Sequence, residues 1–149
     1  MEIKKILFPI DLTANSSKIL PYVLSISEKY NSAIYLLHVV QDLLRWGHLY
    51  VPHTSMERFQ KEAAEGAEKA MQRICDDQLH SCPNFQRRIV SGDPVTEILN
   101  TIESENIDLV IMGTHGRKGL EHALFGSVAE NVVKRSTVPV LTINPHHLQ

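Results

Sequence analysis

The sequence predicts an α/β fold: an open five-stranded parallel sheet with helices on both faces, formed by a single domain over residues 1–149. Short apolar runs alternate with helical segments, which is typical of a parallel sheet built from right-handed crossovers. The run AIYLLHVV, residues 33–40, is apolar almost throughout, as expected for a strand covered on both faces. A length of 149 residues with 43% hydrophobic residues suits one domain with its own core.

Five segments are predicted to be strands, because each is a short apolar run bounded by charged, turn or capping residues. The first run ends at Pro9, since proline would cost an internal strand a ladder hydrogen bond. The third is the most polar and is therefore expected near an edge of the sheet. The predicted strands are Lys4–Ile10, Ala33–Val40, Phe85–Val90, Asp108–Met112 and Val138–Asn144.

Four segments are predicted to be helices from their apolar spacing and capping residues. Pro21 indicates that the first helix starts late or bends, because proline is tolerated only in the first turn of a helix. The predicted helices cover about Ser16 or Ser17 to Lys29, Met56 to Cys75, Pro94 to about Glu105 after the cap residue Asp93, and about Gly126 to Arg135.

Four of the seven glycines fall within residues 112–127, between a predicted strand and a predicted helix. Glycine lets a ligand approach backbone N–H groups closely, and a helix N-terminus offers unpaired donors to phosphate. The stretch therefore supplies two phosphate-binding pieces, the turn Gly113–Gly116 and the helix start Gly126–Val128. A glycine pair alone is a weak signal, and Gly119 also fits a simple loop kink; the combination is what favours phosphate.

Several common classes of site are excluded. Neither a Walker-type G-x-x-x-x-G-K-[ST] loop nor a G-x-G-x-x-G after the first strand occurs. The balance of 15 basic against 17 acidic residues argues against a nucleic-acid surface. Without a secretory signal or a membrane-length apolar run, we expect a cytoplasmic protein with no membrane contact. Cys75 and Cys82 fit neither a zinc site nor a redox pair and are expected to be reduced thiols.

The spacing G-x2-G-x9-G-S, formed by Gly113, Gly116, Gly126 and Ser127, resembles the ATP-binding signature of the universal stress protein family. The segments ILFPIDLTANSS, LLHVV, SGDPVTEIL and VPVLTI resemble that family as well. The resemblance implies the ATP-binding branch of the family and a Rossmann-like sheet with strand order 3-2-1-4-5. In this order the direction reverses between strands one and four, where Asp11 and Gly113 would meet.

The resemblance also implies which residues bind ATP. Strand one would supply Pro9 and Asp11 to the adenosine, and the backbone of Val39 would read the edge of the adenine. We expect Mg²⁺ or Mn²⁺ on the phosphates, with no metal site formed by protein side chains alone. The remaining implied contacts are Met112 and Gly113 at the floor near the ribose, Gly116 at the phosphate turn, and Gly126, Ser127 and Val128 at the helix start.

Several side chains near this site allow two interpretations. Asp11 either orients the ribose hydroxyls, meets a metal on the phosphates, or caps the turn DLTANSS. Arg117 and Lys118 either approach the terminal phosphates or are solvated loop residues. His115 has no identifiable catalytic partner in the sequence, which favours a role in stabilising the loop.

The long segment Gln41–Ser55 has no clear periodicity, and connections of this length are often functional. Its side chains form either a lid over the nucleotide or an apolar cap on the core. The side chains concerned are Trp46, His48, Tyr50 and His53.

The sequence therefore predicts a stress-response protein that binds ATP and acts as a nucleotide-dependent switch or interaction module with an unidentified protein partner. A weak ATPase is the alternative, because no dedicated base is visible. A flavin mononucleotide module is less favoured, since it leaves the glycines after strand four unexplained. Val138–Asn144 is uncharged and lies at an edge in the implied strand order, which predicts a homodimer through this strand.

Overall fold

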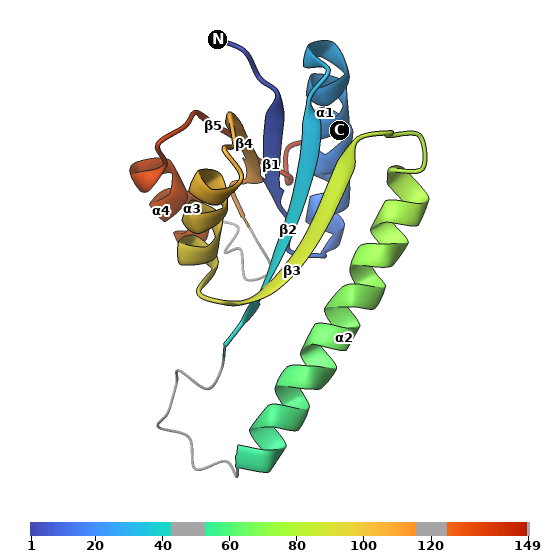
Figure 1. The fold of residues 1–149 in the computed structure, drawn as a ribbon, viewed down its shortest axis with the longest axis vertical. Helices are drawn as coiled ribbons and strands as arrows, with labels where there is room; N and C mark the ends of the chain where they lie inside the picture. Colours follow the sequence, from blue (N-terminus) through green and yellow to red (C-terminus); the bar gives the residue numbers. More distant parts are fainter. Residues whose placement is uncertain (43–52, 116–124, 149) are drawn as a thin grey trace.

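The computed structural model describes residues 1–42, 53–115 and 125–148. They form a five-stranded sheet between two layers of helices (Figure 1). Every pair of neighbouring strands is parallel, and the order is β3-β2-β1-β4-β5, so the predicted fold class and strand order are confirmed. The strands are β1 (Lys5–Pro9), β2 (Ala33–Gln41), β3 (Phe85–Gly92), β4 (Leu109–Gly113) and β5 (Val140–Ile143). The helices are α1 (Ala14–Tyr30), α2 (His53–Gln78), α3 (Pro94–Ser104) and α4 (Ser127–Arg135).

The strands differ in length, and this difference shapes the edge of the sheet at which they end. β1 and β4 have five residues each, whereas β2 has nine. β3 is an edge strand, as its polar sequence predicted, and it runs beyond the expected end at Val90 to Gly92 because it stays paired with β2. β5 is shorter than the predicted strand Val138–Asn144 at both ends.

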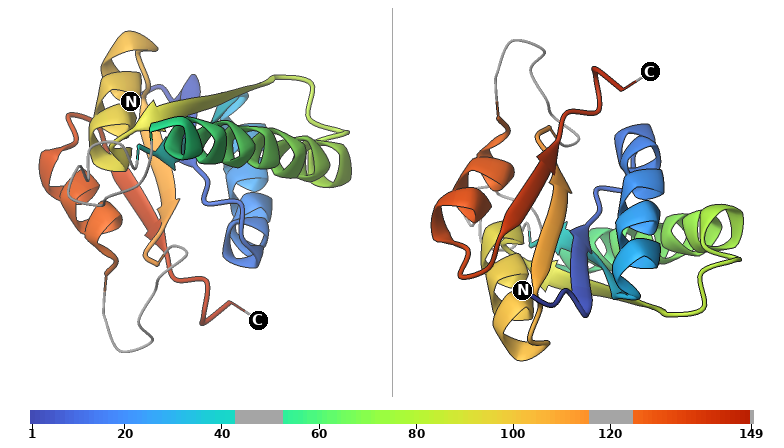
Figure 2. Two further views of the ribbon diagram at one scale, coloured as in Figure 1. Left: turned by 90° about the horizontal axis from the view of Figure 1, so that it is seen from below. Right: turned by 90° about the horizontal axis from the view of Figure 1, so that it is seen from above.

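The sheet buries one core on each face. Successive residues of a strand point to opposite faces, so Ile6 and Phe8 enter one core and Leu7 enters the other. Figure 2 shows α1 and α2 on one side of the sheet and α3 and α4 on the other. The first core contains Ile19, Leu20 and Val23 of α1 with Met71 and Cys75 of α2, and the second contains Ile98 and Ile102 of α3 with Ala129 and Val132 of α4.

Helix α1 begins earlier than predicted and continues through Pro21. Thr13 is its N-cap residue, and its side chain accepts a hydrogen bond from the Asn15 N–H, so the expected start at Ser16 or Ser17 is wrong. Proline inside a helix costs about 3 kcal/mol. Burial of Leu20 and Val23 against the sheet offsets that cost, because tertiary packing supplies most of a helix's stability.

Helix α2 is 26 residues long and begins at His53, so the end of the segment expected to be a loop is helical. In Figure 1 its N-terminal half extends beyond the strands, whereas its C-terminal half lies against the sheet. Phe59 in the first half is 55% exposed, and Met71 in the second half is fully buried. Among the described helices, none has the length and apolar content needed to cross a lipid bilayer.

Candidate functional site at the carboxyl edge of the sheet

The carboxyl ends of β1 and β4 diverge near the middle of the sheet. β1 pairs with β4 only through Ile6 and Leu7. Beyond these pairs, β1 continues beside β2 to Pro9, and β4 continues beside β5 to Gly113. The strand order changes direction at this split, and ligands of open α/β sheets bind in the crevice at such a point. The predicted site residues Pro9 and Gly113 thus lie on its two sides.

The backbone of Val39 points toward the space beyond the end of β1. β2 runs on to Gln41 after its last pair with β1, which joins Leu37 to Pro9. The Leu37 carbonyl accepts a hydrogen bond from the Ile10 N–H at 2.8 Å, so the backbone groups of odd-numbered β2 residues face the β1 side. The N–H and C=O of Val39 follow this alternation and offer one donor and one acceptor past the end of β1.

The Asp11 carboxylate is held within its own turn. Its Oδ1 accepts hydrogen bonds from the Thr13 N–H at 2.9 Å, from the Thr13 hydroxyl at 2.7 Å and from the Ser16 hydroxyl. The Ser16 hydroxyl also accepts from the Asp11 N–H at 3.1 Å. Asp11 therefore organises the turn before α1, while Thr13 is the residue that caps the helix. All three bonds to the carboxylate reach the same oxygen.

The residue after Asp11 adopts a backbone conformation that is rare for a bulky side chain. Leu12 has a φ of 61°, in the left-handed region. Such a conformation costs about 1–3 kcal/mol and persists only where the surroundings determine it. The bonds to Asp11 lie on both sides of Leu12 in sequence, and the Leu12 side chain packs against the first core. These contacts fix the path of the chain at the end of β1.

Gly113 is required by packing as well as by its place at the split. A Cβ added there would lie 2.9 Å from Cδ1 of Ile19 and 3.2 Å from the carbonyl oxygen of His115. Helix α1 and the following backbone therefore leave no room for a side chain. Met112 is buried in the second core, with 4% of its surface exposed. The fold alone thus accounts for the residue types at these two positions.

The N-terminus of α4 presents backbone donors without a side-chain cap. Gly126 is the N-cap residue and makes no side-chain hydrogen bond. The first intrahelical bond runs from the Glu130 N–H to the Gly126 carbonyl at 3.0 Å, so the helix supplies no acceptor for the N–H groups of Ser127, Val128 and Ala129. The Gly126 N–H donates to the Thr114 carbonyl at 2.6 Å, which ties the start of α4 to the end of β4. This arrangement suits an anion.

His115 lies buried beside this connection. Its Nδ1 is 2.8 Å from the Thr114 hydroxyl, and its ring meets that of His146 edge to face at a centroid distance of 5.3 Å. Its side chain is 5% exposed. These contacts support the loop-stabilising interpretation rather than a catalytic one.

Some predicted site residues lie outside the described parts of the chain. They are Gly116, Arg117, Lys118 and Gly119 in the phosphate turn and Trp46, His48 and Tyr50 in the proposed lid. Sequence reasoning missed Ser16, although the run of hydroxyl and cap residues in DLTANSS carried the signal. Within residues 1–42, 53–115 and 125–148, no group of three potential ligand side chains is placed to hold a metal ion.

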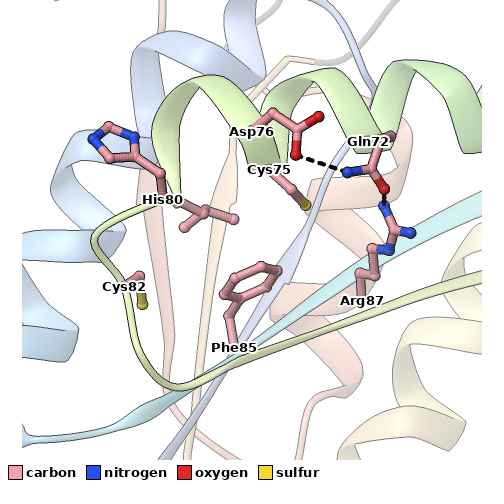
Figure 3. Close-up of a pocket in the computed structure, with 8 residues that line it drawn as sticks. Gln72, Cys75, Asp76, His80, Cys82, Phe85 and Arg87 are labelled. Atoms are coloured by element: carbon pink, nitrogen blue, oxygen red, sulfur yellow. Dashed lines mark hydrogen bonds between the residues drawn. The ribbon is translucent and has the colours of Figure 1, made fainter.

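A pocket of about 470 Å³ lies at the opposite end of the sheet, between the end of α2 and the start of β3 (Figure 3). Phe85, Cys75 and Cys82 line it, and the Arg87 guanidinium bonds across it to Gln72. Burial raises the pKa of the Cys75 thiol above its ordinary value, although nearby Arg87 opposes the shift. A thiol that resists ionisation is a poor nucleophile, so this pocket offers less chemistry than the carboxyl edge.

Comparison with known proteins identifies the family. The profile of the universal stress protein family matches residues 2–144. The chain belongs to this family. It is 28% identical over 152 residues to universal stress protein MJ0577 of Methanocaldococcus jannaschii, a match covering 94% of each chain. Against the solved structure of MJ0577, the TM-score is 0.84 at 30% identity, with 97% of each chain covered.

Two more distant structures of the family hold nucleotides. A universal stress protein in complex with cAMP has a TM-score of 0.62 at 19% identity and covers 97% of this chain and 99% of its own. The Archaeoglobus fulgidus protein in complex with dAMP has a TM-score of 0.59 at 15% identity, covering 97% of this chain and 100% of its own. At these identities the likeness shows a shared fold.

Proposed function

We propose that this chain is an ATP-binding universal stress protein, in which nucleotide binding at the carboxyl edge of β2, β1 and β4 controls an interaction with a protein partner. The observation that carries the proposal is the N-terminus of α4. It leaves three backbone N–H groups without intrahelical acceptors and without a capping side chain, next to the split between β1 and β4. A phosphate group matches both the donors and the positive end of the helix dipole.

The three parts of a nucleotide would follow the order of the strands. The Val39 N–H and C=O at β2 would pair with the edge of the adenine, which presents an acceptor and a donor. Asp11 at β1 would lie opposite the sugar, and the start of α4 would bind phosphate. Gly116, Arg117 and Lys118 would complete the phosphate contacts, as the sequence signature implies.

Mg²⁺ or Mn²⁺ would enter with the phosphates. Asp11 is the one carboxylate among the predicted site residues, and the described residues place no three ligand side chains together. A divalent ion at this edge would therefore take most of its ligands from the triphosphate and water. This donor set is consistent with the expectation that protein side chains alone form no metal site.

The flavin mononucleotide alternative receives no support from the turn DLTANSS. It required the hydroxyls of this turn to bind a phosphate. The Thr13 and Ser16 hydroxyls instead donate to the Asp11 carboxylate, and a hydroxyl has a single proton to donate. The carboxylate beside them would also repel a phosphate.

Extraction of the purified protein and identification of any bound nucleotide tests the proposal first. Isothermal titration with ATP, ADP, AMP and cAMP, each with and without Mg²⁺ and Mn²⁺, then ranks the ligands. We expect ATP with metal to bind most tightly. Tighter binding of AMP or cAMP would contradict the assignment to ATP, no nucleotide binding would contradict the nucleotide site itself, and a bound chromophore absorbing near 450 nm would favour the flavin alternative.

We also propose that the chain forms a homodimer through β5. This strand is the outer strand next to β4, and Figure 2 shows it at the end of the sheet. The carbonyls of Pro139 and Ile143 accept hydrogen bonds from β4 and the residue after it, so the N–H and C=O of Val140 and Thr142 point away from the sheet. Leu141 is 40% exposed. A second copy pairing with this apolar, uncharged edge would satisfy its backbone groups.

A further inference from the structure

The turn after β1 holds Asp11 by one oxygen only. Oδ1 receives the Thr13 N–H, the Thr13 hydroxyl and the Ser16 hydroxyl, so three donors converge on it. A carboxylate oxygen offers about two lone pairs, and Oδ1 has no capacity left for a ligand. Any further hydrogen bond to this carboxylate must therefore reach Oδ2.

The two hydroxyls fix the orientation of the carboxylate because each is itself held. Ser16 is 4% exposed, and its hydroxyl accepts from the Asp11 N–H while it donates to Oδ1. The Thr13 hydroxyl accepts from the Asn15 N–H as the cap of α1 while it donates to the same oxygen. Leu12, with its φ of 61°, fixes the backbone between them. The carboxylate is thus pre-oriented before any ligand arrives.

The place of Asp11 in the sheet indicates which part of a ligand it meets. β1 lies between β2, whose Val39 backbone faces the ligand side, and β4, which leads to α4. With a base at Val39 and phosphate at α4, the sugar is the part next to the end of β1. An ionised carboxylate only accepts hydrogen bonds, and the donors that a nucleotide carries there are the sugar hydroxyls.

We infer that Ser16 and Thr13 are positioning residues that hold Asp11 so that its Oδ2 binds the ribose hydroxyls, and that this arrangement makes the site select ribonucleotides over nucleotides lacking both hydroxyls. The inference rests on the proposed nucleotide function and names a determinant of its specificity. An amide or a freely rotating carboxylate at this position would not discriminate to the same degree, since pre-orientation is what gives a hydrogen bond its selectivity.

The test compares ATP with 2′,3′-dideoxy-ATP by isothermal titration. Loss of hydrogen bonds to a charged acceptor changes affinity by about tenfold or more, so the wild-type protein should prefer ATP by at least about that factor. In Ser16→Ala the preference should fall to about threefold or less, because ATP binds more weakly while dideoxy-ATP binds as before. Asp11→Asn should also lose the preference, since its amide nitrogen donates rather than accepts.

Two variants serve as matched controls. Thr13→Ser keeps the hydroxyl and should retain the full preference. Ser17→Ala removes the neighbouring hydroxyl, which makes no bond to Asp11 in the structure, and should also leave the preference unchanged. Thermal unfolding checks that each variant folds, and Asp11→Asn provides an independent reading if Ser16→Ala does not.

Each outcome decides the matter. An equal preference in wild type and Ser16→Ala would overturn the inference, as would a wild-type protein that binds both nucleotides equally well. A preference that disappears in EDTA would assign Asp11 to the metal and would also overturn it. Failure of the wild-type protein to bind any adenine nucleotide would instead refute the proposed function itself.

Discussion

Replacing Ser127 with proline should weaken ATP binding while leaving the fold intact. Ser127 is the first residue of α4, and the helix does not use its N–H. Proline is favoured at this position because its φ is already that of a helix. It also restricts the preceding residue to an extended conformation, and Gly126 already has φ −71° and ψ 154°. The substitution therefore deletes one backbone donor with little other change.

The expected loss follows from the strength of one hydrogen bond to a charged group. Such a bond contributes about 1.5–3 kcal/mol, and about 1.4 kcal/mol corresponds to a factor of ten in affinity. If the Ser127 N–H binds phosphate, the Kd for ATP should rise about tenfold to a hundredfold. Ser127→Ala is the matched control, because it removes the hydroxyl and keeps the N–H.

Isothermal titration with ATP and Mg²⁺ measures the effect, and thermal unfolding checks the stability of the helix. The melting temperature of Ser127→Pro should stay close to that of the wild type. An unchanged Kd in a folded Ser127→Pro protein would refute the placement of phosphate on this helix N-terminus. A loss of the same size in Ser127→Ala would assign the effect to the hydroxyl instead of the backbone.

Four further predictions concern the loop, the cap, the dimer and turnover. Gly116→Val should block close approach of the phosphate and raise the Kd for ATP by more than about tenfold; calorimetry showing an unchanged Kd would contradict this. Gly126→Ser should stabilise the protein by a few tenths of a kcal/mol yet weaken ATP binding, and a variant that binds ATP as tightly as wild type would count against the reasoning. Light scattering should give twice the 16.9 kDa chain mass for the wild type and the monomer mass for Thr142→Pro, whereas Leu141→Pro should lower the melting temperature because its N–H faces β4. ATP hydrolysis should be slow or absent, since no Walker lysine or dedicated base is visible; turnover of several per second in purified protein would overturn the interpretation as a binding module.

The sequence predicted the strands and their order well, because parallel strands buried on both faces have an unambiguous apolar signature. The boundaries of the helices were harder to predict. DLTANSS contains several residues able to cap a helix, and Pro21 made the later ones look favourable. The choice of Thr13 depends on its contact with Asp11 and on burial of Leu20 and Val23, which are tertiary interactions.

The candidate site was predictable where it depends on residue type and not where it depends on strand length. The glycine and serine at the start of α4 stand in the sequence at recognisable spacing. The usefulness of Val39, by contrast, comes from β2 running on past its last pair with β1, which no local pattern reveals. Gly113 shows the converse limit, because packing against Ile19 explains a glycine that the sequence had suggested for the ligand alone.

The identity of the cap residue of α4 is best explained by a ligand. The backbone of Gly126 is extended, with φ −71° and ψ 154°, so any residue could adopt its conformation and glycine is not needed for the turn. Serine or aspartate there would stabilise the helix, because its side-chain oxygen would accept from the N–H of the second or third helical residue. That oxygen would then occupy the donors of Val128 or Ala129 that a phosphate needs. Glycine leaves them exposed at a small cost in helix stability, which is why Gly126→Ser should move stability and ATP affinity in opposite directions.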